Sequence, residues 1–210
     1  MKLYHGTSSK YFASIKRIGL QPRGNRKGNW THSVDSCQEA VYFTSCYGPY
    51  FCFSAIKNSK HYPIIIEIDT SFMFDLDKFV PDEDVIAQTT KGYGDNLNQK
   101  SKYWRERLHT FQATDMWKES LKILGTCAYL GNVPPTAISR VAHIKENHVP
   151  LMFNWDCSIT IMNYRILGKQ YEEKTAILFG DKEPERRIGV EVEIQDFTFG
   201  RFNSSKKISI

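Results

Sequence analysis

The chain has 210 residues, of which 24% are charged and 13% aromatic, and its formal net charge is +5. This composition excludes a disordered chain, and the length suits one domain with a substantial core rather than two full domains. No apolar run is long enough to span a membrane and the N-terminus lacks the apolar segment of a signal peptide, so we expect a cytoplasmic protein.

The first half alternates short apolar runs with turn residues, which predicts strands around one helix. In chain order we expect a strand at 2–5, a helix up to residue 18 that Ser8-Ser9 caps and Gly19 ends, a polar loop at 24–36, a strand at 41–43, an aromatic-rich segment at 47–55 and a strand at 63–69. The acidic run Asp82-Glu83-Asp84 has no histidine nearby, which predicts a capping or solvated turn rather than a metal site.

The second half adds one long helical pattern and further strands. We expect a loop at 89–98, helical periodicity over 104–124, a strand at 126–130, an extended exit at 133–135 and strands at 159–164, 175–179 and 188–194. This order predicts an α+β fold in which strands dominate.

The cysteines and the basic residues give weaker signals. Five cysteines without paired spacing or a histidine cluster predict unpaired thiols and no metal: Cys37, Cys46, Cys52, Cys127 and Cys157. Lysines and arginines gather at 10–27, 100–107 and 206–207, a pattern that suits a polyanion but is also typical of solvated surfaces.

The sequence Leu3-Tyr4-His5-Gly6-Thr7 is the first candidate functional motif. A histidine at a strand end, followed by glycine, presents its imidazole and the neighbouring backbone N–H groups to a cleft. By itself such a histidine is more often a structural hydrogen-bonding group. The order of LYHGT, VYFTS, PIIIEID and YLGNVPPTAI along the chain is more specific than any one of them.

This ordered set resembles the ADP-ribosyltransferase superfamily over roughly residues 1–145, and in particular its His–Tyr branch, which includes the poly-ADP-ribose polymerases and DarT-like toxins. The resemblance implies an α+β ADP-ribosyltransferase-like fold whose core, at 1–145, is a mixed, antiparallel-rich split sheet. Residues 146–210 are then a C-terminal β-rich elaboration of the same domain.

The resemblance also implies NAD⁺ as co-substrate. His5 matches the histidine that bonds a ribose hydroxyl in this family, Gly6 would let the backbone approach the nicotinamide amide, and Thr7 could add a hydroxyl. Tyr42 matches the tyrosine whose ring packs beside the nicotinamide.

A second aromatic ring usually completes that sandwich. We expect Phe53, or else Tyr50, in this role, because both lie in the segment after the second motif. Core packing explains either residue taken alone better than ligand binding does.

The implied reaction cleaves the nicotinamide–ribose bond through an oxocarbenium-like transition state, which a negative group stabilises. The family's glutamate aligns with Thr126, which carries no charge. A carboxylate could come from elsewhere, Gln112 could position an acceptor, or the protein could bind NAD⁺ without transferring. We favour a relocated carboxylate and name Glu119 first, although a solvated helix position explains it as well; the other candidates are Asp115, Asp82, Glu83 and Glu191.

We therefore expect a mono-ADP-ribosyltransferase acting on a macromolecule, with a toxin or defence role by family analogy. The basic balance and the candidate stacking residues Trp30 and Trp104 favour nucleic acid slightly over protein as acceptor. The missing glutamate leaves open a catalytically silent module that binds NAD or ADP-ribose. An RNA 2′-phosphotransferase, which has the same fold, is disfavoured because Thr44 and Ser45 stand where that family has arginines.

Overall fold

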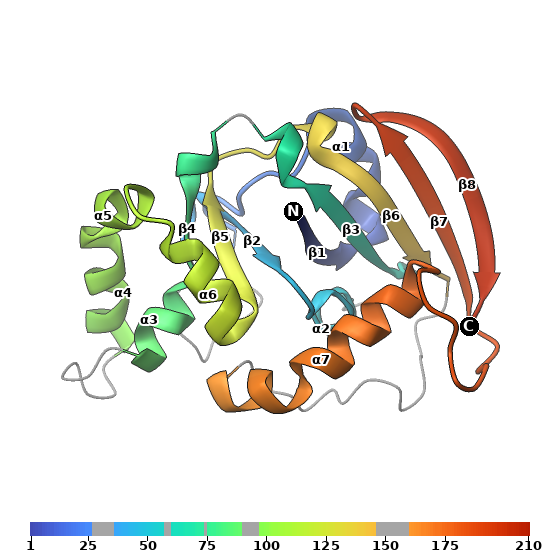
Figure 1. The fold of residues 1–210 in the computed structure, drawn as a ribbon. Helices are drawn as coiled ribbons and strands as arrows, with labels where there is room; N and C mark the ends of the chain where they lie inside the picture. Colours follow the sequence, from blue (N-terminus) through green and yellow to red (C-terminus); the bar gives the residue numbers. More distant parts are fainter. Residues whose placement is uncertain (27–35, 57–59, 74, 90–96, 146–159) are drawn as a thin grey trace.

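The protein is built on one curved sheet with helices on both of its faces (Figure 1). The computed structural model describes residues 1–26, 36–56, 60–73, 75–89, 97–145 and 160–210. Within these ranges eight strands follow the order β4-β5-β2-β1-β3-β6-β7-β8, and all their pairings are antiparallel. The predicted α+β class is confirmed, whereas the parallel part of the expected mixed sheet is absent from the described strands.

The bounds of the elements are as follows. The strands are β1 Lys2–Ser8, β2 Ala40–Thr44, β3 Pro63–Asp69, β4 Phe79–Pro81, β5 Thr126–Leu130, β6 Ile138–Ile144, β7 Glu191–Thr198 and β8 Arg201–Ser209. The helices are α1 Phe12–Ile18, α2 Gly48–Ser54, α3 Glu83–Thr89, α4 Leu97–Glu106, α5 Leu108–Gln112, α6 Met116–Leu124 and α7 Ile161–Leu178. Short 3₁₀ turns are η1 Ser9–Tyr11, η2 Thr70–Phe72, η3 Leu76–Lys78 and η4 Pro135–Ala137.

Side chains alternate between two faces of the sheet, because successive residues of a strand point to opposite sides. Leu3, Phe43 and Ile66 share one apolar cluster with residues of α1 and α6; we call this side the α1 face. Tyr4 and Ile65 point the other way, into a cluster with residues of α2 and α7; we call this side the α7 face. Helices α3, α4 and α5 lie near β4, at one end of the sheet (Figure 1).

The central strand β3 is apolar on both sides of the sheet. Ile64, Ile65 and Ile66 are fully buried, and β3 lies between β1 and β6. A continuous apolar run is typical of a strand that is covered on both faces. The strand predicted at 63–69 is therefore confirmed.

Strands β1 and β2 are joined at a single point, the pair Tyr4 and Thr44. All five residues of β2 pair instead with β5 on its other side, and all seven residues of β1 pair with β3. The sheet is thus nearly split between β1 and β2, beside His5 and Tyr42.

The helical pattern over 104–124 forms parts of three helices rather than one. Helix α4 ends at Glu106, α5 spans Leu108–Gln112, and α6 begins at Met116. The break allows Phe111 and Trp117 to enter two different apolar clusters, which one straight helix could not reach.

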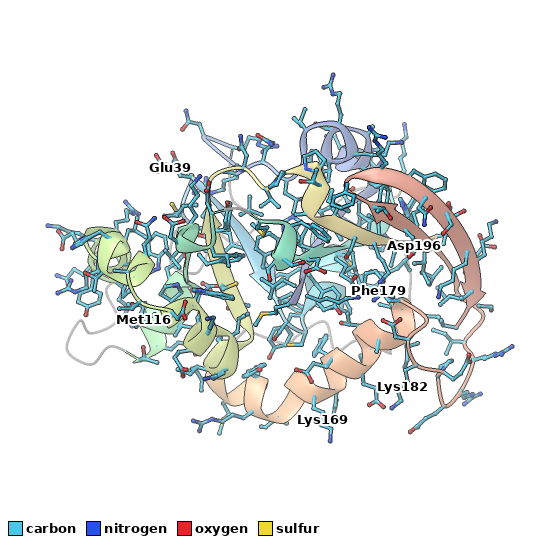
Figure 2. The ribbon with its side chains drawn as sticks, turned by 45° about the horizontal axis from the view of Figure 1, so that its top comes forward. Glu39, Met116, Lys169, Phe179, Lys182 and Asp196 are labelled. Atoms are coloured by element: carbon cyan, nitrogen blue, oxygen red, sulfur yellow. The ribbon has the colours of Figure 1, made fainter. Side chains whose placement is uncertain are left out.

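The strands expected at 159–164 and 175–179 are wrong, since α7 runs from 161 to 178. The Thr160 hydroxyl caps it by accepting a hydrogen bond from the Asn163 N–H at 3.1 Å. Its inward positions, Tyr164, Gly168, Tyr171, Thr175 and Leu178, follow a helical spacing of three and four residues. Figure 2 shows Phe179, just past its end, turned inward, with Lys169 and Lys182 pointing outward. The predicted strand at 188–194 is realised as β7, which pairs with β6.

No helix in the described ranges combines the length and the apolar character needed to cross a bilayer.

Candidate functional site

His5 closes the gap between the two diverging strands. Its Nδ1 lies 2.9 Å from the backbone oxygen of Tyr42. A carbonyl oxygen can only accept, so Nδ1 carries the proton and donates. The edge of the ring meets Phe43 on the α1 face, and burial lowers the pKa of the imidazole. His5 therefore links β1 to β2 as a neutral donor.

The structure brings His5 and Tyr42 together through the backbone of Tyr42, not through its side chain. Because Tyr4 pairs with Thr44, His5 lies on the same face as Phe43 and Tyr42 lies on the opposite face. The expected arrangement, in which one dinucleotide contacts both the imidazole and the Tyr42 ring from a single cleft, is not formed by these side chains.

The space beside Gly6, where we expected the nicotinamide amide to approach the backbone, is filled by other parts of the protein. A Cβ at Gly6 would lie 2.3 Å from the Cys52 nitrogen and 2.6 Å from the Gly48 oxygen. Glycine is needed here because the backbone of α2 packs directly on β1. Thr7 is buried, with 8% of its surface exposed.

The expected aromatic sandwich is replaced by core packing. Tyr50 and Phe53 are 4% and 7% exposed, and both belong to the cluster between α2 and α7. The Tyr50 ring packs edge-on against Phe51 and Tyr171. These two residues stabilise the α2–α7 contact and belong to a different apolar cluster from Tyr42.

Tyr42 instead binds a buried carboxyl group. Its hydroxyl donates to Glu83 Oε1 and accepts from the Cys37 N–H at 2.6 Å, while the same N–H lies 3.1 Å from Glu83 Oε1. Glu83 is only 3% exposed, and its Oε2 has no hydrogen-bond partner among the described residues. Burial, with the charge of Asp82, raises the pKa of Glu83 well above its ordinary value. Burial and the nearby Glu83 likewise raise the pKa of Tyr42.

The acidic run is therefore a buried cap rather than a solvated turn. Asp82 Oδ1 accepts from the Asp84 N–H at 2.9 Å at the start of α3, as a capping residue does, but Asp82 is only 7% exposed. A sequence signal for this burial does exist, since the run lies between the apolar segments Phe79-Val80-Pro81 and Val85-Ile86-Ala87.

Thr126, the position at which the sequence resemblance led us to expect a glutamate, lies beside this cap. It is 2% exposed and pairs with Thr44, which places it on the face that carries Tyr42. Burial raises the pKa of Asp82, and the hydrogen bond from the Asp84 N–H opposes that rise. The Ser120 hydroxyl ties the two segments together: it accepts from the Asp82 N–H at 3.0 Å and donates to the Thr126 oxygen at 2.7 Å. Through Ser120, Asp82 is therefore held next to the strand position of Thr126.

Glu119 and Asp115 do not join this site. Glu119 is 57% exposed and bonds Lys122, and Asp115 is 71% exposed and bonds Lys118. Both carboxylates lie on the outer surface, each neutralised by a lysine three residues later. The structure thus corrects the expectation for Glu119 by placing Glu83 beside Tyr42.

Trp104 is not an exposed stacking residue. It is 1% exposed, and its indole N–H donates to the Pro81 oxygen at 2.9 Å. Trp30, the other candidate, and Cys157 lie outside the described residues. Within the described ranges, no three side chains of histidine, cysteine, aspartate or glutamate are grouped to hold a metal ion.

Comparison with known proteins gives little further information. No family model and no curated protein matches the chain. A solved structure named EcPltA aligns with 69% of this chain and 75% of its own, at 14% identity and a TM-score of 0.38.

Proposed function

We propose that the chain is a mono-ADP-ribosyltransferase that uses NAD⁺ as co-substrate and modifies a macromolecule, with nucleic acid favoured over protein as acceptor. The observation that carries the proposal is the hydrogen bond between the Tyr42 hydroxyl and the buried Glu83 carboxyl group, on the face of the sheet that also carries Thr126. Glu83 thus supplies a carboxyl group on the face of the sheet where Thr126 stands in place of the expected glutamate.

The residues present fit part of NAD⁺. Tyr42 is partly exposed and offers an aromatic face for a pyridinium ring. The Oε2 of Glu83 is a buried acceptor without a partner among the described residues, and a ribose hydroxyl that reached it would supply the missing donor. Gly6, Tyr50 and Phe53 do not fit the roles expected of them, because helix packing occupies all three. NAD⁺ would supply the labile nicotinamide–ribose bond.

Glu83 would serve as the negative group that stabilises positive charge developing on the ribose. Tyr42 positions it, since the phenol donates to Oε1, while Oε2 is buried without a partner among the described residues. Only the ionised carboxylate can act in this way. Because burial and Asp82 raise the pKa of Glu83, turnover should increase with pH through that raised value.

The same burial favours one alternative, a silent module that binds NAD or ADP-ribose. A carboxyl group that stays protonated at neutral pH can hold a ligand but cannot stabilise a cationic transition state. An RNA 2′-phosphotransferase gains no support from Arg140, because Glu67 and Asp181 already occupy its guanidinium group.

The test is incubation of the protein with NAD⁺ labelled in the adenylate part, together with separate pools of DNA, RNA and lysate proteins. Nicotinamide release and label on one pool would support transfer and identify the acceptor. We expect Glu83→Gln and Tyr42→Phe to lower turnover at least tenfold and Glu83→Gln to remove the rise with pH.

The matched control is Glu119→Gln, which makes the same chemical change on the outer surface of α6. It should leave turnover unchanged. Saturable NAD⁺ binding without nicotinamide release would favour the silent module, and full activity of Glu83→Gln would refute the assignment of Glu83.

A further inference from the structure

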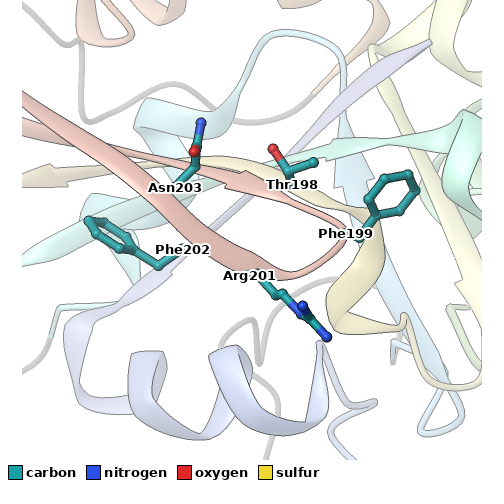
Figure 3. Close-up of a pocket in the computed structure, with 5 residues that line it drawn as sticks. All are labelled: Thr198, Phe199, Arg201, Phe202 and Asn203. Atoms are coloured by element: carbon teal, nitrogen blue, oxygen red, sulfur yellow. The ribbon is translucent and has the colours of Figure 1, made fainter.

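The tip of the β7–β8 hairpin presents two aromatic rings and an arginine to solvent. Phe199 is 64% exposed and Phe202 is 56% exposed, whereas six of the eleven phenylalanines in the described ranges are buried in the core. Figure 3 shows the Phe199 ring at the turn and the Phe202 ring farther along the hairpin, with Arg201 attached between them. Together with Thr198 and Asn203 they line a shallow hollow. We call Phe199, Arg201 and Phe202 the hairpin tip.

The backbone holds Phe199 outward at an energetic cost. Thr198 pairs with Arg201, so the loop consists of Phe199 and Gly200 alone, with φ angles of 50° and 75°. Two left-handed residues are typical of the tight hairpin turn whose twist suits the sheet, and asparagine is usual at the first of them. Phe199 is the one residue other than glycine in the described ranges with a positive φ. A strained position occupied by an exposed phenylalanine points to a role for its ring.

The tip is fixed against the body of the protein. A Cβ at Gly200 would lie 2.9 Å from the carbonyl carbon of Pro135, so the turn packs on η4. The Phe72 ring meets the Phe199 ring edge-on at 5.2 Å. The Phe202 ring leans on Phe197 at 6.1 Å. Both exposed rings are therefore preorganised, which lowers the entropy lost when a ligand stacks on them.

Positive charge accompanies these rings. Helix α1 also packs on η4, and it lies at the same end of the molecule as the β7–β8 turn (Figure 1). Its last turn exposes Lys16 and Arg17. In the described part of the chain, Lys16, Arg17 and Arg201 form no ion pair with a carboxylate, and residues 198–203 contain no acidic side chain. This end of the protein therefore carries cations that a polyanion could neutralise.

We propose that the hairpin tip, with the end of α1, binds single-stranded nucleic acid. Exposed rings next to uncompensated cations match the chemistry of unpaired bases on a phosphate backbone, because the bases stack and the phosphates pair with the cations. A protein partner would be expected to meet a broader apolar surface, whereas here two rings flank an arginine. A duplex offers no free base face to the rings. The inference goes beyond the proposed function, since binding needs neither NAD⁺ nor the Tyr42–Glu83 pair.

The experiment measures fluorescence anisotropy of labelled 20-nucleotide single-stranded RNA, single-stranded DNA and the matching duplex, without NAD⁺. We expect the wild-type chain to bind at least one single strand more tightly than the duplex. The double variant Phe199→Asn, Phe202→Ala should lose at least tenfold in affinity. Asparagine tolerates the positive φ, so the turn should still form, and circular dichroism checks the fold.

Two variants of Arg201 separate the contribution of charge to the affinity for nucleic acid from that of the aromatic rings. Arg201→Ala should weaken binding and reduce the dependence of log K on log salt concentration by about one unit, whereas Arg201→Lys should keep that dependence. The control is Met162→Ala with Ile166→Ala, which removes exposed apolar side chains from α7 and should leave affinity unchanged.

Unchanged affinity in the folded double variant would overturn the proposal. So would absence of single-strand binding by the wild type, or tighter binding to the duplex. Retention of lysate proteins through the hairpin tip, without binding of either single strand, would assign the surface to a protein partner instead.

Discussion

We predict that Asp84 lowers the stability of the fold at neutral and alkaline pH and that Asp84→Asn removes that cost. Burial and the charge of Asp82 raise the pKa of Asp84 from 3.8 to about 7. A shift of about 3 units corresponds to about 4 kcal/mol at most, and we expect about 2 kcal/mol because Asp84 is partly exposed. An acid with a raised folded-state pKa contributes its full stability below the unfolded-state pKa and loses it as pH rises. The stability lost to Asp84 should therefore accumulate between about pH 4 and pH 7.

The assay is urea unfolding of wild type and Asp84→Asn at pH 4, 5, 6, 7 and 8. The variant should match the wild type near pH 4 and exceed it by about 2 kcal/mol at pH 8, since the amide never ionises. Glu183→Gln removes an exposed carboxylate and should give no such pH-dependent difference. Equal stability of Asp84→Asn and wild type at pH 8, or the same small effect in both variants, would refute the reasoning.

Two further substitutions test buried polar contacts, each by urea unfolding. The Thr44 hydroxyl donates to the Gly125 oxygen at 2.7 Å and accepts hydrogen bonds from two backbone N–H groups. Thr44→Val should therefore lower the free energy of unfolding by about 2–3 kcal/mol, and Thr44→Ser, which keeps the hydroxyl, by much less. Equal losses in the two variants would contradict this role of the hydroxyl. Glu67 is fully buried: burial by itself raises its pKa, yet hydrogen bonds from Arg140 and Ser139 bring it below the ordinary value. Arg140→Met should therefore cost about 3–5 kcal/mol at pH 7. The loss should shrink as pH falls, because Glu67 without Arg140 becomes protonated at a higher pH than in the wild type; a loss independent of pH would contradict the role of the ion pair.

Much of the fold could be predicted where neighbouring residues alone decide the structure. The runs at 2–5, 63–69 and 126–130 are strands because their apolar side chains suit a covered sheet. Helix α7 was missed because its inward residues are separated by charged ones, and short apolar fragments such as 175–179 have no clear period. Packing against α2, α6 and the sheet selects the helical face.

The candidate site could be predicted only in part. The motifs that carry His5 and Tyr42 are neighbours in space, as the resemblance implies. Glu83 was named only among the distant alternatives, since a run of three acidic residues looks solvated when taken by itself. Its burial depends on α4, α5 and β5 closing around the start of α3, and those contacts join residues far apart along the chain.

The sequence by itself determined which segments form the central strands and which residue types could carry chemistry, because alternation, turn residues and side-chain functional groups are local properties. Tertiary structure decided which side of the sheet each of those residues occupies. Strand side chains alternate with a period of two, so the single pairing of Tyr4 with Thr44 sends the side chains of His5 and Tyr42 to opposite faces. A shift of one residue would have placed them together, and no local pattern in the sequence distinguishes these two registers.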